Sequence, residues 1–133
     1  MQGGQSPVYS PEDEQRSPEI EGLRAVRRAG VEVYRLTRAF PVEERYGLKA
    51  QIRRAAVWVP NNIVEGSARR TQREYAQFLR VALGSASETR YLLDVSRRLE
   101  MLSPAPSKEI EDRYDELVRG LQRLVALVER EAD

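Results

Sequence analysis

The sequence predicts an all-α protein: an antiparallel up-down-up-down four-helix bundle preceded by a disordered N-terminal tail. Apolar residues recur at steps of three and four in four separate segments, and short linkers rich in Pro, Gly or Ser separate these segments. No stretch alternates as a half-buried strand would. The 133 residues suit one domain. We assign residues 1–18 to the tail and residues 19–133 to the bundle.

Residues 1–18 contain two Gly, three Pro and three Ser together with the acidic run at 12–14, a composition typical of disorder. The first helix is predicted over residues 19–39, and Pro41 stops it. Gly30 within it costs about 1 kcal/mol relative to Ala, which predicts a close helix crossing there. The heptad seam of this helix comprises Leu23, Val26, Gly30, Val33, Thr37 and Phe40.

The second helix is predicted from Val42 or Glu43 to Gly66, which is a natural terminator. Arg45, Lys49 and Arg53 are four apart and predict a cationic side. Pro60 is expected to kink or break the helix near Val59. Its apolar face comprises Leu48, Ile52, Ala55, Ala56, Val59 and Ile63.

Thr71 and Glu74 form a capping box that begins a third helix, predicted to end near Leu102. The small residues 84–87 at its centre suggest close packing. Pro104 and Pro106 are expected to hold residues 103–107 in a loop, and Ser107 to cap a fourth helix that ends near Glu131. The predicted core faces comprise Tyr75, Phe78, Leu79, Ala82, Ala86, Thr89, Leu92, Leu93 and Leu99 on the third helix, and Ile110, Tyr114, Leu117, Leu121, Leu124 and Val128 on the fourth.

Charge is unevenly distributed along the chain. The net charge is only +1, yet residues 16–102 carry 17 Lys/Arg against 10 Asp/Glu, while both ends are acidic. There is no His and no Cys, so the commonest general base, metal ligand and thiol chemistry are absent. Glu65, Glu74 and Glu88 do not make a di-metal set, because such bundles use Glu-x-x-His motifs. We expect no catalytic residues, no metal and no cofactor, and a cytoplasmic protein without a membrane span.

Five short motifs stand out in the sequence. They are Tyr34-Arg35-Leu36-Thr37, Phe40-Pro41-x-Glu43-Glu44-x-Tyr46-Gly47-Leu48, Gln51-x-Arg53-Arg54-Ala55-Ala56-Val57, Pro60-x-Asn62-Ile63-x-Glu65-Gly66 and Gly84-Ser85-x-x-Glu88. Together they resemble the motifs of the four-helix-bundle proteins found in intervening sequences of bacterial 23S ribosomal RNA genes, and the resemblance covers roughly residues 23–102. Trp58 departs from the small polar residue usual in that family. The resemblance implies a helical bundle that assembles as a homopentamer, and related retroelement accessory proteins imply an association with RNA.

A set of basic residues is the candidate nucleic-acid-binding surface, since arginine suits bidentate phosphate contacts. The alternative is a solvated face whose cations pair with Glu43, Glu44 and Glu74 or with an adjacent subunit. The set comprises Arg45, Lys49, Arg53, Arg54, Arg69, Arg70 and Arg73.

Two further features admit both a structural and a functional interpretation. Trp58 is expected to be buried in the core or in a subunit interface, with stacking on Arg54 or on a nucleobase as the alternative. Pro60, Asn62, Glu65 and Gly66 are interpreted mainly as a structural kink, with a binding notch as the alternative.

Two functions therefore remain open. One is a non-enzymatic, pentameric bundle that binds RNA through basic residues of the second and third helices. The other is a scaffold that binds a protein partner, with its arginines in intersubunit salt bridges. Deleting residues 1–17 tests whether the acidic tail masks the basic surface, because removal of a mask would raise the affinity for nucleic acid.

Overall fold

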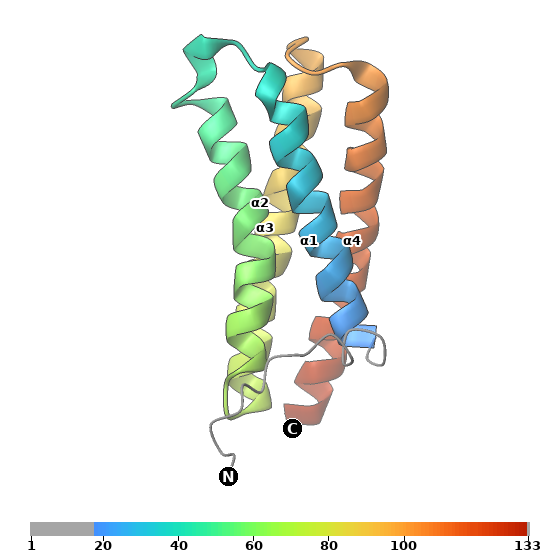
Figure 1. The fold of residues 1–133 in the computed structure, drawn as a ribbon. Coiled ribbons are helices and arrows are strands. Elements are labelled where there is room, and N and C mark those ends of the chain that lie inside the picture. The colour runs from blue at the N-terminus through green and yellow to red at the C-terminus, as the bar shows by residue number, and fades with distance from the viewer. Residues whose placement is uncertain (1–17, 133) are drawn as a thin grey trace.

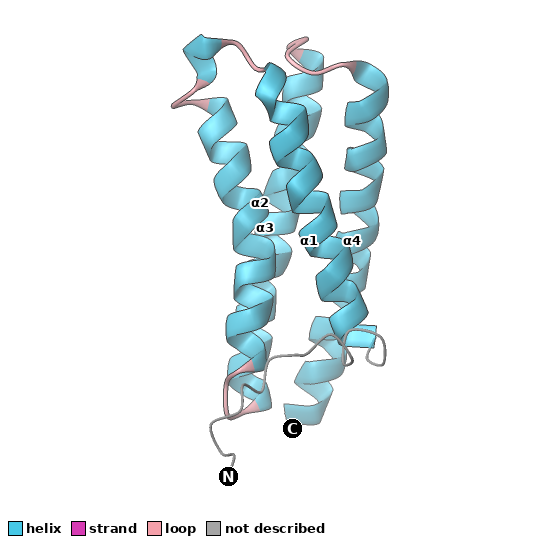
Figure 2. Cartoon of the chain, viewed as in Figure 1, coloured by secondary structure: helices cyan, strands magenta, loops and turns pink. Residues whose placement is uncertain are grey.

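The computed structural model describes residues 18–132, and within that range it consists of helices joined by short loops and turns, without a strand (Figure 2). The four long helices are α1 (Pro18–Leu36), α2 (Leu48–Ser67), α3 (Gln72–Arg98) and α4 (Pro104–Ala132). Short 3-10 turns, η2 (Thr37–Ala39) and η3 (Val42–Glu44), join α1 to α2. The predicted all-α class is confirmed. The predicted tail, apart from Pro18, lies outside the described residues.

The four helices run alternately up and down and form one bundle (Figure 1). α1 packs against α2 and α4, and α3 packs against the same two helices. The predicted apolar faces meet in one core, in which Val33, Ile52, Leu79 and Tyr114 have no exposed surface. The α2–α3 turn lies at the end of the bundle where α1 begins and α4 ends (Figure 1).

The predicted start of the second helix was five or six residues too early. η3 ends at Glu44, a turn follows, and α2 begins only at Leu48. Gly47 occupies the N-cap position and offers no side chain, so Glu44 Oε1 accepts the Leu48 amide at 3.1 Å instead. Arg45 therefore lies in the turn, and it does not continue the helical row of Lys49 and Arg53.

The third helix is also shorter than predicted. It ends at Arg98, and Glu100 adopts a left-handed conformation with φ of 62°. The Met101 amide then donates to the Ser96 carbonyl at 2.9 Å, which closes the helix end. Leu99 was predicted to lie in the core, but it follows the helix end and is 57% exposed.

Proline positions explain how α4 begins, and they show that α2 is not broken at Pro60. Pro104 and Pro106 lie in the first turn of α4, where amides have no intrahelical partner, so they begin the helix instead of forming a loop. Ser107 is consequently no N-cap. Pro60 lies inside α2, which continues to Ser67 without a break. Pro60 has no amide hydrogen, so it cannot donate to the Ala56 carbonyl. The Ala56 carbonyl oxygen faces α1 and lies 3.7 Å from the position that a Cβ on Gly30 would occupy.

Gly66 holds α2 against α3, although it was predicted to act as a helix terminator. It lies in the last turn of α2 and has no positive φ. A Cβ on Gly66 would lie 2.8 Å from Phe78 Cβ and 3.0 Å from Tyr75 Cδ1. The small residues at the centre of α3 are less constrained, because a Cβ on Gly84 would meet nothing within 4 Å.

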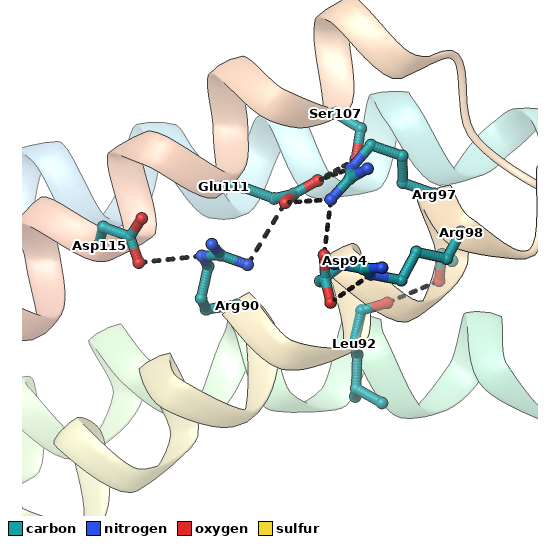
Figure 3. Close-up of polar contacts among 9 residues, drawn as sticks. Arg90, Leu92, Asp94, Arg97, Arg98, Ser107, Glu111 and Asp115 are labelled. Atoms are coloured by element: carbon teal, nitrogen blue, oxygen red, sulfur yellow. Dashed lines mark hydrogen bonds and ion pairs between the residues drawn. The ribbon is translucent and has the colours of Figure 1, made fainter.

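An ion-pair network joins α3 to α4 near the end of α3 (Figure 3). Its centre is Glu111, whose side chain has no exposed surface. Glu111 accepts hydrogen bonds from Arg97 Nε and from Ser107 Oγ, both at 2.8 Å, and from Arg90 at 3.3 Å. The bond to Glu111 raises the pKa of Arg97. These donors compensate for the loss of water around a buried carboxylate.

Two partly exposed carboxylates, Asp94 and Asp115, extend this network outward. Arg90 Nε donates to Asp115 at 2.9 Å, and Asp94 accepts from Arg97 at 2.6 Å and from Arg98 at 3.0 Å (Figure 3). Partial burial acts to raise the pKa of Asp94. The hydrogen bond from Arg98 and the charges of Arg98, Arg97 and Arg90 outweigh it, so the pKa is lowered below its usual value. Arg90, Arg97 and Arg98 are thus paired with carboxylates within the chain.

Substitution by alanine should have opposite effects on stability at Gly66 and at Gly84. Gly66→Ala should destabilise the protein by about 1–3 kcal/mol, because the added methyl group overlaps α3. Gly84→Ala should stabilise it by about 0.5–1 kcal/mol, because alanine favours a helix interior and the space is open. Urea denaturation measures both. Equal effects of the two substitutions would contradict the packing role of Gly66.

The buried carboxylate predicts a second stability effect. Glu111→Gln keeps the shape but removes the charge that three donors share, so it should cost about 1.5–3 kcal/mol in unfolding free energy. The matched control is Glu109→Gln on the exposed side of α4, with an expected change within about 0.5 kcal/mol. Comparable losses in both variants would show that Glu111 contributes nothing particular.

The lowered pKa of Asp94 predicts that the stability of the folded protein depends on pH. Because its pKa is lowered in the folded protein, the unfolded chain binds the proton more tightly. Its contribution to stability is present above the ordinary pKa of 3.8 and is lost as the pH falls through the lowered value. Asp94→Asn should therefore flatten the loss of stability below about pH 4, whereas Asp112→Asn, at an exposed position, should not. Denaturation midpoints between acidic and neutral pH measure this; identical slopes would refute it.

Candidate functional site

The seven candidate basic residues form two separate clusters instead of one patch. The start cluster surrounds the beginning of α2, and the turn cluster surrounds the connection between α2 and α3. A helix rises 1.5 Å per residue, so Lys49 and Arg69 are separated by about 30 Å. The clusters consequently lie at opposite ends of the bundle (Figure 1). The start cluster is Arg45, Lys49, Arg53 and Arg54, and the turn cluster is Arg69, Arg70 and Arg73.

Arg53 is occupied by the fold. Its Nε donates to Thr37 Oγ1 and its Nη2 donates to the Tyr34 carbonyl, both at 2.9 Å. Its guanidinium also lies over the Tyr34 ring, 4.5 Å from the centroid. Thr37 in turn donates to the Val33 carbonyl at 2.8 Å. Arg53 therefore clamps α2 to the end of α1, and its removal would disturb the fold as well as any ligand.

The rest of the start cluster faces solvent. Arg54 is exposed, and so is Arg45, whose guanidinium lies 5.7 Å from the centroid of the neighbouring Tyr46 ring. Lys49 is partly exposed on the first turn of α2. These three side chains provide positive charge without a structural contact to another helix among the described residues.

The turn cluster combines one oriented arginine with two free ones. Arg69 Nε donates to the Glu65 carbonyl at 3.2 Å, and its guanidinium lies 5.1 Å from the centroid of the Phe78 ring. Arg70 and Arg73 are exposed on either side of Thr71. Thr71 caps α3 by accepting the Glu74 amide at 3.1 Å, as the predicted capping box requires. The cluster thus adjoins a helix N-terminus, where the peptide dipoles favour anions.

Within residues 18–132, no member of either cluster forms an ion pair. The predicted pairing with Glu43, Glu44 and Glu74 is therefore wrong for this part of the chain; Glu44 caps α2 instead. By contrast, Arg80 pairs with Glu129, and Arg90, Arg97 and Arg98 pair with the carboxylates of α3 and α4. The two clusters thus differ from these paired arginines of α3, although the α4 arginines also form no ion pair within residues 18–132, namely Arg113, Arg119, Arg123 and Arg130.

The motif of Pro60, Asn62, Glu65 and Gly66 makes mainly structural contacts. Asn62 is buried, and its Nδ2 donates to the Trp58 carbonyl at 2.8 Å, one turn earlier. Glu65 is exposed, and no ion pair joins it to Arg53 or Arg54. With Gly66 packed against α3, these residues supply no notch that opens the helix.

Trp58 does not lie in the core. It is 44% exposed, and Val57 beside it is 48% exposed, because both project from α2 away from its buried face. Among the described residues, no cation–π contact joins Arg54 to Trp58. The indole is therefore available on the same helix as the start cluster.

The described residues contain no group of three potential metal ligands, and Glu65, Glu74 and Glu88 do not converge. Glu88 instead accepts a hydrogen bond from Gln51 at 3.4 Å. Between Pro18 and Ala132, no helix has both the length and the apolar character that crossing a membrane requires.

Comparison with known proteins supports the sequence resemblance. Residues 20–123 match the 23S rRNA-intervening sequence protein family. A crystal structure of a protein of unknown function from the S23 ribosomal protein family, from Bacteroides thetaiotaomicron, superimposes with a TM-score of 0.74 at 20% identity. The alignment covers 81% of this chain and 97% of that one, and the likeness is one of fold. No curated protein sequence matched. With the family match spanning most of the bundle, the chain belongs to the 23S rRNA-intervening sequence protein family.

Proposed function

We propose that this protein is a non-enzymatic, cytoplasmic homopentamer that binds RNA through the basic residues of α2 and the α2–α3 turn. The observation that carries the proposal is that the start and turn clusters gather cations that have no carboxylate partner within residues 18–132. By contrast, Arg90, Arg97 and Arg98 of α3 pair with carboxylates. Unpaired surface arginines provide the sequence-independent part of nucleic-acid affinity.

The positions of the two clusters and of Trp58 bear on how RNA would be bound. Two clusters about 30 Å apart would contact separate stretches of one backbone. In a ring of subunits, both clusters would recur around the assembly, and binding at several of them would raise the overall affinity. The exposed Trp58 offers a surface on which an unpaired base would stack. We therefore propose single-stranded RNA as the preferred form.

The family assignment is consistent with this proposal but does not by itself establish binding. Its name refers to an intervening sequence of 23S rRNA. The S23 relative of known structure is itself a protein of unknown function. RNA binding by this chain therefore rests on the charge argument.

A scaffold that binds protein is the second candidate function. Val57 and Trp58 are about half exposed on α2, and Val81 is 51% exposed on α3. Aromatic and arginine residues together are typical of the centre of protein interfaces. In this alternative, the unpaired arginines contact carboxylates of a neighbouring subunit or of a partner protein.

RNA binding across a salt series separates the two functions. The wild-type protein should bind generic single-stranded RNA with an affinity that falls steeply between about 50 and 200 mM salt. Arg69→Ala/Arg70→Ala/Arg73→Ala should weaken binding and reduce the slope of log K against log salt by about 2, at about 0.7 per lost contact. Arg45→Ala/Lys49→Ala/Arg54→Ala should act similarly; Arg53 is left intact because it clamps α1.

The control removes equal charge elsewhere. Arg28→Ala/Arg119→Ala/Arg130→Ala changes three exposed arginines of α1 and α4 and should leave the slope nearly unchanged. Light scattering on the same samples measures the assembly mass. Equal slopes in all variants, or no RNA binding by the wild type at low salt, would refute the RNA proposal. Loss of the oligomer in either cluster variant would favour arginines in subunit contacts.

A further inference from the structure

An apolar groove runs between α1 and α4 on the described part of the bundle. Its volume is about 650 Å³, and it reaches inward as far as Ile63 of α2. Apolar side chains form most of its walls. The α1 helix packs less extensively against α4 than α3 packs against α4. Representative lining residues are Gly22 and Val26 on α1 and Gly120, Leu124 and Leu127 on α4.

Two glycines keep this groove open. Each lies inside a helix, where glycine costs about 1 kcal/mol relative to alanine. A Cβ on Gly22 would meet nothing within 4 Å, and one on Gly120 would meet only the flexible end of Arg123, at 3.9 Å. Unlike Gly66, neither glycine is required by packing inside the described chain. They leave room for an occupant that comes from outside residues 18–132.

We propose that the occupant is the N-terminal segment of the same chain, residues 1–17, which docks along the α1–α4 groove. This inference is independent of the proposed RNA binding. The first argument is position. α1 begins at Pro18, only four residues before Gly22 at the groove, so the segment is attached beside its site. Such tethering gives an effective concentration in the millimolar range, and weak contacts then suffice for occupancy.

The second argument is reach. The 17 residues would span about 55 Å if extended, at about 3.3 Å each. On α4 the groove runs from Arg113 to Leu127, which is about 21 Å at 1.5 Å per residue. The segment is therefore long enough to turn back and follow the whole groove.

The third argument is complementarity of charge and polarity. Arg113 and Arg123 line the groove against a single acid, Glu116, and no ion pair within the described residues occupies either arginine. The segment carries the acidic run Glu12-Asp13-Glu14, within six residues of α1. Before this run come Pro7, Val8 and Tyr9, an apolar group suited to the apolar walls.

Disulfide trapping tests this docking in the full chain, which has no cysteine of its own. One variant pairs Ser10→Cys with Gly120→Cys in the groove. The matched control pairs Ser10→Cys with Gly84→Cys, which lies in open space on α3. Under mild oxidation, the groove pair should form an intrachain disulfide at least about tenfold faster, which corresponds to about 1.4 kcal/mol of preference. Peptide mapping distinguishes intrachain from interchain links.

Charge reversal supplies a second readout. Arg113→Glu/Arg123→Glu should slow trapping of the groove pair several-fold. Adding Glu12→Lys/Asp13→Lys/Glu14→Lys to that variant should restore the rate, and circular dichroism checks that all variants keep their helices. Equal trapping rates for the groove and control pairs would overturn the proposal. Links formed only between chains would also overturn it and assign the groove to a second copy. Neither result depends on whether the protein binds RNA.

Discussion

The buried carboxylate of Glu111 is the constraint on which the charge pattern of this bundle depends. A carboxylate without exposure must be surrounded by donors, and Arg90, Arg97 and Ser107 provide them. Two of these donors are arginines, which then draw Asp94 and Asp115 into the same network. Arg90 and Arg97 of α3 consequently hold α3 and α4 together. The cations of α2 have no such role, with the exception of Arg53, and they remain available.

The α2 helix contains two residues that are unfavourable inside a helix, Pro60 and Gly66. Pro60 removes a backbone donor in mid-helix, yet the helix continues to Ser67. Beside it, Asn62 Nδ2 donates to the Trp58 carbonyl, and the Ala56 carbonyl oxygen lies near Gly30 of α1. At its end, Gly66 permits contact with Tyr75 and Phe78 of α3. The position of the turn cluster follows from that contact, because Arg69 stacks on Phe78.

Helix number, helix type and most core faces could be predicted, because apolar periodicity over 20 or more residues is a strong local signal. Boundaries were less predictable where Pro or Gly can serve two roles. Pro104 and Pro106 were interpreted as helix breakers, but the first turn of α4 tolerates them. Gly66 was interpreted as a terminator, although its role is packing, and this requires knowledge of what lies opposite.

The candidate site was predicted only as a list of cations. The sequence shows where arginines occur, but which of them are neutralised depends on neighbours far along the chain, such as Glu111, 14 residues beyond Arg97. One local signal was available: Ser107 lies four residues before Glu111, and Asp94 three before Arg97, so each pair shares a helix face. The clamp between Arg53 and Thr37 has no comparable signal, because it joins two different helices.

Arginine-specific chemical modification, mapped by mass spectrometry with and without single-stranded RNA, tests the central claim most directly. The claim is that the start and turn clusters are free to bind RNA, whereas Arg97 is held in the ion-pair network of Glu111. Without RNA, Arg54, Arg70 and Arg73 should react readily and Arg97 slowly. With RNA, those three should become protected, while the exposed Arg119 and Arg130 stay reactive. Uniform protection of all exposed arginines, or reaction of Arg97 as fast as Arg70, would contradict the account.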